Sequence, residues 1–254
     1  MASRQLPVLP LTVSVSTGDS SVPPRVLAQT VEMIQAVSIG VIHKNMGTLP
    51  LQPAEFLLYG SPAGYIQAVA AVFPKSEVTS ATGQTAGFTF HSEVVIPVYL
   101  YSNDAYLANT LTHEMTHVTL NQDSLGKQLP TWLNEGFAWY NGMQAEAQIS
   151  VAQETNLSNI LLKGVDIARA NGQLLPLTAT EQDVLHHNAQ YNLEFFDYLA
   201  VNNLISKYGL QKFRQFLANV HGEGVEGSFL KTFAISLGQY ERSFYQSYEG
   251  VHQF

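Results

Sequence analysis

The sequence predicts an α+β fold, with strands confined to the first half of the chain and helices alone in the second half. Two observations support this prediction. Short segments of alternating apolar and polar residues occur before residue 102, whereas beyond about Tyr140 the apolar residues recur at helical spacing and no segment has a convincing strand pattern. The change falls near residues 121–130. We therefore expect two parts, residues 1–122 and 123–254, that together form one domain.

The first half is predicted to begin with a strand, a long helix and a second strand. Leu11–Val15 alternates apolar and polar residues, and a Gly-Asp-Ser-Ser run ends this pattern before Pro23 and Pro24. Proline suits the first turn of a helix, and apolar residues at helical spacing continue from there to Gly47. Glu55–Tyr59 then predicts the next strand.

A small mixed sheet with helices around it follows from the rest of this half. Ala63–Phe73 predicts a second helix, and Gly83–Tyr101 alternates with Gly and Ser interruptions, as two paired strands do. Asp104 is a suitable N-cap for a third helix. One side of that helix is apolar and consists of Leu107, Leu111, Met115 and Val118.

The second half is predicted to be entirely helical. Pro130 and Thr131 open a helix that we expect to end near Tyr140, and Gly209 and Gly222 stand where helices would stop. The further predicted helices are Leu157–Ala170, Tyr191–Lys207, Gln211–Val220 and two short helices within Ser228–Tyr248.

Composition narrows the classes of protein to which the chain can belong. Its 254 residues are 46% apolar, which is enough for the core of one large domain. The net charge of −8 makes nucleic acid an unsuitable partner. We expect no transmembrane segment, because the longest apolar run, Ala63–Phe73, is shorter than the roughly 18 to 20 residues that cross a bilayer. No pattern indicates an oligomeric state.

The absence of cysteine excludes disulfides, thiolate metal sites and a cysteine nucleophile. Any metal ligands must therefore be histidines and carboxylates. Met1–Leu6 lacks a basic stretch followed by an apolar core, so we expect no signal peptide at this position. An acidic chain without cysteine favours an extracellular or cell-envelope location, with the cytoplasm as the alternative.

The segment His113–His117 reads His-Glu-Met-Thr-His. On a helix its two histidines lie about 40° apart and one turn along, so both imidazoles can reach one ion. Glu114 lies off that line and can take a proton from a metal-activated water without binding the metal. Glu135 follows His117 by 18 residues, which allows a turn and a returning helix to supply a third ligand and to leave the fourth position for water.

Two segments, Leu111–His117 and Leu129–Ala138, resemble the gluzincin superfamily of zinc metallopeptidases, the lineage of thermolysin and aminopeptidase N. The resemblance is strongest to its small bacterial peptidase MA-like members. Weaker similarity continues through Tyr191–Gly209 and Gly227–Phe244, so that it covers roughly the last 150 residues. It implies a thermolysin-like zincin domain with the active site in the cleft between the mixed half and the helical half.

The resemblance also implies a function for individual residues. His113, His117 and Glu135 would bind one catalytic zinc ion, and Glu114 would act first as general base and then as proton donor. The substrate would be a peptide or protein. We expect it to lie extended along an edge strand, with Gly83–His91 or Val94–Tyr101 offering the backbone groups.

Tyr191 is the predicted partner of the oxyanion, because similar enzymes place a phenol opposite the metal at the start of a helix after a polar loop. The alternative is an aromatic residue that only packs at an interface. His186 and His187 compete for the same role, although adjacent histidines in a polar stretch are commonly solvated.

The sequence favours an endopeptidase over an aminopeptidase. The aminopeptidase branch shares the segment Leu133–Ala138, but it also uses a Gly-x-Met-Glu-Asn strand to hold the free amino terminus, and this chain lacks that strand. The spacing between the second histidine and the glutamate in that branch is also one residue longer. A third possibility is a zinc-containing binding or regulatory module that no longer turns over a substrate.

Overall fold

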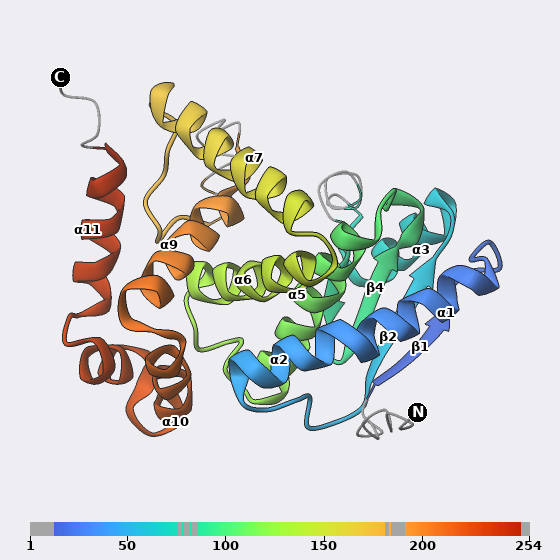
Figure 1. Ribbon diagram of the computed structural model, residues 1–254, viewed down its shortest axis with the longest axis horizontal. Helices are drawn as coiled ribbons and strands as arrows, with labels where there is room; N and C mark the ends of the chain where they lie inside the picture. Colours follow the sequence, from blue (N-terminus) through green and yellow to red (C-terminus); the bar gives the residue numbers. More distant parts are fainter. Residues whose placement is uncertain are drawn as a thin grey trace, which may run out of the picture.

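A small four-stranded sheet lies in the first half of the chain, and the described residues of the second half form helices joined by loops, with no strand among them (Figure 1). The α+β prediction is confirmed in this form. The structure, a computed structural model, describes residues 13–75, 78, 82, 86–180, 183 and 191–249.

The sheet is mixed and has the strand order β1-β2-β4-β3. β1 (Val13–Thr17), β2 (Ala54–Tyr59) and β4 (Glu93–Pro97) are parallel, and β3 (Phe88–Phe90) is antiparallel to β4. β3 is therefore an edge strand. β4 is paired on both sides, so the expectation that a substrate could pair with Val94–Tyr101 is wrong for the strand residues of that segment.

The predicted hairpin is confirmed for the residues of β3 and β4. Residues 83–85, with which the predicted segment began, lie outside the described residues. Among the described strands β3 pairs with β4 alone, so its other edge is the place where an extended ligand could pair.

The helix predicted to end at Gly47 is present, but a π-helical turn interrupts it. α1 (Pro24–Met33) continues through the π turn Ile34–Ser38 into α2 (Ile39–Met46), and Gly47 follows with a φ of 79°. A residue with a side chain adopts this left-handed conformation only at a cost, so the glycine suits the end of the helix.

This helix also corrects one expectation from the sequence. Residues Pro24–Met46, and not Ala63–Phe73, form the longest apolar helix among the described residues, and by length and composition it could cross a membrane. A core helix of a globular domain has the same properties. Here its buried side chains, among them Ile34 and Val41, pack in the core beside the sheet.

Helices cover both faces of the sheet. α1, α2 and α5 (Asp104–Gln122) share a core with the side chains of one face, including Phe56 and Val94. On the other face α3 (Pro62–Val72) packs through Tyr65 and Val69 against Phe88 and Val95. α5 begins one residue earlier than expected, because the side chain of Asn103, and not that of Asp104, accepts a hydrogen bond from the Tyr106 N–H at 2.8 Å.

The second half contains longer helices than the sequence predicted. α6 runs past Tyr140 to Ile149, α7 begins at Val151 rather than Leu157, and Gly224, with a φ of 68°, breaks α10 where Gly222 was expected to. Gly209 ends α9 as predicted. The bounds are Thr131–Ile149 for α6, Val151–Ala170 for α7, Leu193–Tyr208 for α9, Leu210–Phe233 for α10 and Leu237–Glu249 for α11.

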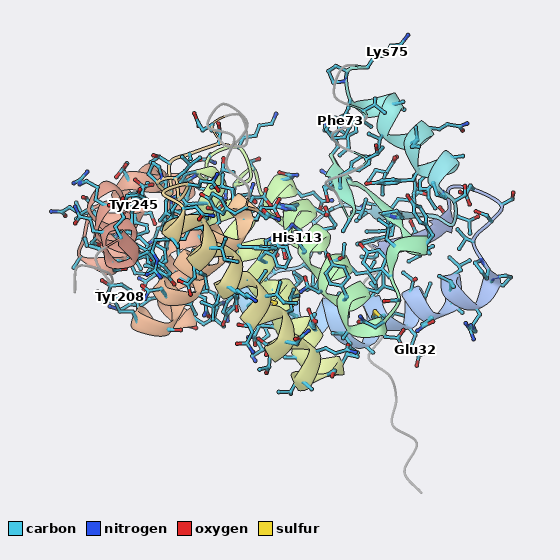
Figure 2. The ribbon with its side chains drawn as sticks, turned by 90° about the horizontal axis from the view of Figure 1, so that it is seen from above. Glu32, Phe73, Lys75, His113, Tyr208 and Tyr245 are labelled. Atoms are coloured by element: carbon cyan, nitrogen blue, oxygen red, sulfur yellow. The ribbon has the colours of Figure 1, made fainter. Side chains whose placement is uncertain are left out.

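The central helix of the molecule is α6, which packs on α5, α7 and α9. The close approach of α6 and α9 depends on Gly136, because a Cβ at this position would lie 2.3 Å from the backbone oxygen of Asp197. α6 therefore joins the sheet-bearing part of the molecule to the helical part. His113 lies between these two parts in the view of Figure 2.

Candidate metal centre

α5 presents two histidines from an otherwise buried helix. Most of its side chains are buried between the sheet and α6, including polar ones. The threonines of this helix fit there because Thr112, Thr116 and Thr119 each donate a hydrogen bond to the carbonyl four residues earlier, at 2.7 to 2.8 Å. His113 and His117 lie on the remaining, partly exposed side.

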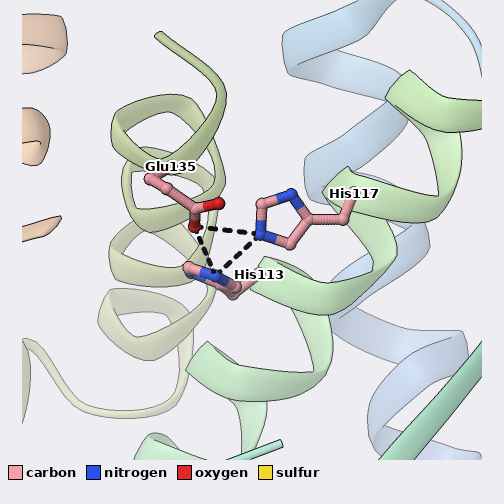
Figure 3. Close-up of side chains that lie close together, drawn as sticks. All are labelled: His113, His117 and Glu135. Atoms are coloured by element: carbon pink, nitrogen blue, oxygen red, sulfur yellow. Dashed lines mark hydrogen bonds and ion pairs between the residues drawn. The ribbon is translucent and has the colours of Figure 1, made fainter. Parts of the chain in front are cut away.

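The structure brings together the three residues predicted to bind metal (Figure 3). Nε2 of His117 lies 3.0 Å from Nε2 of His113. Oε2 of Glu135 lies 3.2 Å from Nε2 of His117 and 3.6 Å from Nε2 of His113. Glu135 reaches this position from the first turns of α6. The turn and returning helix inferred from the spacing of the motif are therefore present.

These three residues fit a metal ion. Ligand atoms about 2.0 to 2.2 Å from a tetrahedral Zn²⁺ are about 3.3 Å from one another, and the three separations of 3.0 to 3.6 Å bracket that value. Each residue directs one atom to the same point, so the group could hold a metal ion. The fourth tetrahedral position would remain for another ligand.

The electrostatics of these three residues also favour the binding of a cation. Burial alone lowers the pKa of His117, but the carboxylate of Glu135 outweighs this effect and raises it to about 10. The same pairing lowers the pKa of Glu135 although burial acts in the opposite direction. A protonated imidazole thus neutralises Glu135 in the free protein, and a bound metal ion would displace that proton.

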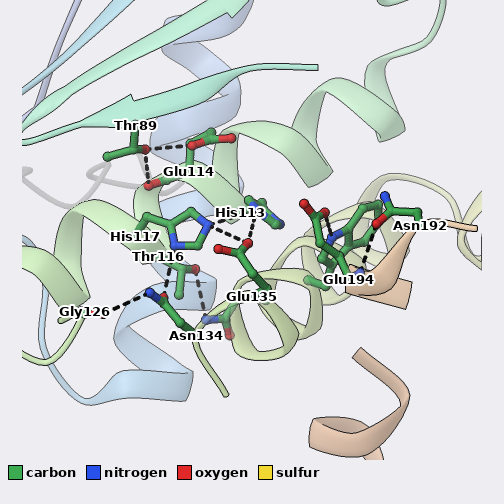
Figure 4. Close-up of polar contacts among 12 residues, drawn as sticks. Thr89, His113, Glu114, Thr116, His117, Gly126, Asn134, Glu135, Asn192 and Glu194 are labelled. Atoms are coloured by element: carbon green, nitrogen blue, oxygen red, sulfur yellow. Dashed lines mark hydrogen bonds and ion pairs between the residues drawn. The ribbon is translucent and has the colours of Figure 1, made fainter. Parts of the chain in front are cut away.

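His117 is oriented by Asn134, the residue before the predicted glutamate ligand (Figure 4). Nδ1 of His117 lies 3.1 Å from Oδ1 of Asn134, and an amide oxygen can only accept, so the imidazole must carry its proton on Nδ1. Asn134 is held in turn by donating to the carbonyl of Gly126 at 3.3 Å. Once Nε2 has lost its proton, its lone pair is therefore directed at the ligand group.

His113 has a different neighbour. The indole ring of Trp139 meets the His113 ring edge to face, with centroids 5.6 Å apart and an interplanar angle of 83°. The indole N–H donates to Oε2 of Glu194 at 2.7 Å. Glu194 was not among the candidate residues from the sequence, because an acidic residue in the first turn of a helix has an ordinary explanation in the helix dipole.

Glu114, the predicted general base, is 5% exposed and is held from the sheet. The hydroxyl of Thr89 on β3 donates to its Oε2 at 2.7 Å (Figure 4). Thr89 was also missed in the sequence, where it is one threonine in a short alternating segment. Its contact connects the predicted base to the edge strand.

Tyr191 does not begin the helix as predicted: α9 starts at Leu193, and Tyr191 lies two residues before it. Its hydroxyl oxygen accepts a hydrogen bond from the N–H of Leu175 at 3.0 Å, and burial raises its pKa. Within the described residues no hydrogen bond or ion pair joins Tyr191 to the three ligands. Its role at the oxyanion stays a prediction. His186 and His187, the alternatives, lie outside the described residues.

A mixed sheet, a His-Glu-x-x-His helix beside it and a returning helix with the third ligand are the features of a zincin-like domain. A comparison of the sequence with known families identifies the superfamily within this class. A model of the Peptidase MA superfamily matches residues 35–249, and the chain belongs to that superfamily. The resemblance inferred from the two motif segments is thus confirmed, and membership indicates a metallopeptidase. No curated protein matches the chain.

Proposed function

We propose that the protein is a zinc-dependent peptidase that hydrolyses internal peptide bonds. The observation that supports this most is the convergence of Nε2 of His113, Nε2 of His117 and Oε2 of Glu135 beside the buried carboxylate of Glu114. Two imidazoles and one carboxylate with an open position are the donor set of catalytic rather than structural zinc sites. We extend the proposal to a thermolysin-like arrangement of the domain.

Bound zinc would polarise the carbonyl of the substrate and lower the pKa of water toward about 7. The residues of the chain supply the remaining steps. Glu114 takes the proton of the attacking water and then delivers it to the leaving amine, while Thr89 holds its carboxylate in place. We propose Tyr191 as donor to the oxyanion, because accepting from Leu175 leaves its own O–H free to donate.

The edge strand favours a peptide as substrate. Among the described strands β3 is paired on one side only, and Thr89 in this strand contacts the proposed base. An extended peptide that adds a strand to β3 would therefore lie beside Glu114. This arrangement supports the choice of Gly83–His91 as the substrate-binding segment.

Glu114→Gln tests the assignment of the base. The amide has nearly the same shape and cannot accept the proton of water, so we expect zinc to be retained and peptide hydrolysis to fall about 10³-fold or more. Metal analysis of the purified protein and mass-spectrometric mapping of cleavage sites in a peptide library measure both properties. Full hydrolysis by the zinc-containing variant would show that another residue is the base.

The same library distinguishes the alternatives for the wild-type protein. An endopeptidase cleaves peptides with a blocked amino terminus, whereas an aminopeptidase needs the charged amine and leaves blocked peptides intact. Bound zinc without cleavage of any peptide would indicate a binding or regulatory module instead. We expect cleavage of blocked peptides at internal bonds, because the chain has no Gly-x-Met-Glu-Asn segment.

A further inference from the structure

The two histidines of the metal centre are held in different ways. His117 has a hydrogen-bond partner for its second ring nitrogen, the side chain of Asn134. For Nδ1 of His113 the described part of the chain provides neither a hydrogen bond nor an ion pair, since the polar contacts of this ring all involve Nε2. A ligating histidine is normally oriented through its second nitrogen. Something else must therefore fix the ring of His113.

Trp139 is the side chain in a position to do so. It is 8% exposed, its ring contacts that of His113, and Phe195 of α9 packs on it at a centroid distance of 5.5 Å. The hydrogen bond from its indole N–H to Glu194 fixes the rotation of the indole. Glu194 is itself anchored in the first turn of α9, where its N–H donates to the side chain of Asn192 at 2.9 Å.

We propose that the hydrogen-bonded pair Glu194 and Trp139, called the brace below, fixes the ring of His113 and thereby sets the metal affinity of the site. The inference rests on the proposed metal centre and adds a positioning role for α9, which supplies none of the three ligands. A ring with free rotation about χ2 would lose this freedom on binding metal, whereas a braced ring has already lost it.

The carboxylate of Glu194 could also act by its charge, and the two effects can be separated. Burial and the neighbouring carboxylate of Glu135 raise the pKa of Glu194, while His113 and the indole N–H act in the opposite direction. Glu194→Gln removes the charge but keeps an oxygen that can accept from the indole. Glu194→Ala removes both. A brace requires the acceptor, so the glutamine variant should behave like the wild-type protein.

The experiment measures the zinc affinity of each purified protein by competition with a chelating dye. Loss of a group that orients a ligand typically lowers metal affinity about 10-fold to 100-fold, which is the loss expected for Glu194→Ala. Glu194→Gln should stay within about threefold of wild type by the same measure. Trp139→Phe keeps the packing but cannot hold Glu194, and it should lower the affinity about 3-fold to 10-fold.

The chain contains a matched control in a second tryptophan–glutamate pair. The indole N–H of Trp132, also on α6, donates to Oε1 of Glu241 at 2.8 Å, and its ring stacks on Tyr240 instead of a histidine. Glu241→Ala should therefore leave the zinc affinity unchanged while removing the same kind of bond. Circular dichroism establishes whether each variant is folded. If Glu194→Ala does not fold, the comparison of the two single variants Trp139→Phe and Glu194→Gln provides the test.

Tryptophan fluorescence gives a second readout that a general loss of stability would not change. Zinc binding to His113 should alter the emission of Trp139, and this change should be absent in Trp139→Phe. Equal zinc affinities of the wild-type protein and Glu194→Ala, or an equal loss in Glu241→Ala, would overturn the brace alone. A wild-type protein that binds no zinc would overturn the proposed metal centre and the brace with it.

Discussion

At the scale of single residues, the contact between Thr89 and Glu114 determines where the proposed base points. Glu114 has several side-chain rotamers, and the hydrogen bond from the Thr89 hydroxyl selects one of them. Because Oε2 is engaged, Oε1 is the oxygen left to take a proton from water. Thr89 is thus a positioning residue that acts through the base.

Thr89→Val should lower kcat about 10-fold and leave KM within about twofold, because valine has the same shape but cannot donate to the carboxylate. The measurement is steady-state hydrolysis of a blocked peptide by zinc-loaded protein. Thr89→Ser, which restores a hydroxyl, should recover most of the rate. If valine and serine variants lose activity equally, or if KM rises while kcat is kept, the hydroxyl does not position the base.

The ligands could be predicted from the sequence, whereas the roles of Thr89, Trp139 and Glu194 could not. His113 and His117 are related by helical periodicity, and Glu135 follows at a spacing that a turn and a returning helix can bridge. Thr89 reaches Glu114 across 25 residues, and Trp139 reaches Glu194 across 55. Such contacts depend on how the sheet and helices pack, and no local pattern encodes them.

At the scale of elements, α6 supplies Glu135, Asn134 and Trp139 and packs on both α5 and α9. Its approach to α9 has no room for a side chain at position 136, next to the glutamate ligand. The obstacle is backbone of α9 rather than the end of a flexible side chain. A substituent there must push the two helices apart.

Gly136→Ala should therefore destabilise the protein, by about 1 to 3 kcal/mol or more, and weaken zinc binding by displacing Glu135. Thermal unfolding and dye competition measure the two effects. Gly164 in α7 is the matched control, because a Cβ there would lie 3.6 Å from Phe195, an ordinary contact. Gly164→Ala should be neutral or stabilising by up to about 1 kcal/mol, since alanine favours the helix. Similar effects at both positions would contradict this account of the packing.

The ends of the helices show where local patterns stop being sufficient. The sequence predicts that α6 ends near Tyr140, whereas the helix continues through Asn141 and Gly142 to Ile149. In the fold Asn141 accepts a hydrogen bond from Asn45 at 2.8 Å and donates to Thr116 at 3.1 Å. Gly142 provides the close approach to Asn109. Tertiary partners thus continue a helix that the local sequence would end.

At the scale of the whole molecule, the metal centre joins two parts of the structure. His113 and His117 come from the helix that packs on the sheet, and Glu135 comes from the helix that leads into the helical core. A ligand that binds only the folded state stabilises it by mass action. Zinc should therefore raise the unfolding temperature of the protein, and a chelator should reverse this effect.

The stability of the metal-free protein should depend on pH through the pairing of His117 with Glu135. The folded-state pKa of His117 is about 10 against an ordinary 6.5, so the stabilisation is complete below pH 6.5 and is lost as the pH rises through 10. The pKa of Glu135 is lowered from 4.5, so its contribution is complete above pH 4.5 and is lost at more acidic pH. Stabilisation by the pair is thus greatest between pH 4.5 and 6.5.

Between pH 6 and pH 9, the stabilisation by bound zinc should depend on pH in the opposite direction. The metal competes with the proton on His117, so its affinity rises with pH, and the increase in unfolding temperature caused by zinc should be larger at pH 9 than at pH 6. Thermal unfolding of chelator-treated and zinc-loaded protein between these two values measures both trends. His117→Gln lacks both the ion pair and this zinc ligand, so its chelator-treated and zinc-loaded forms should show the same dependence of unfolding temperature on pH. A chelator-treated wild-type protein whose stability falls no more steeply than that of His117→Gln would show that the ion pair does not stabilise the metal-free fold.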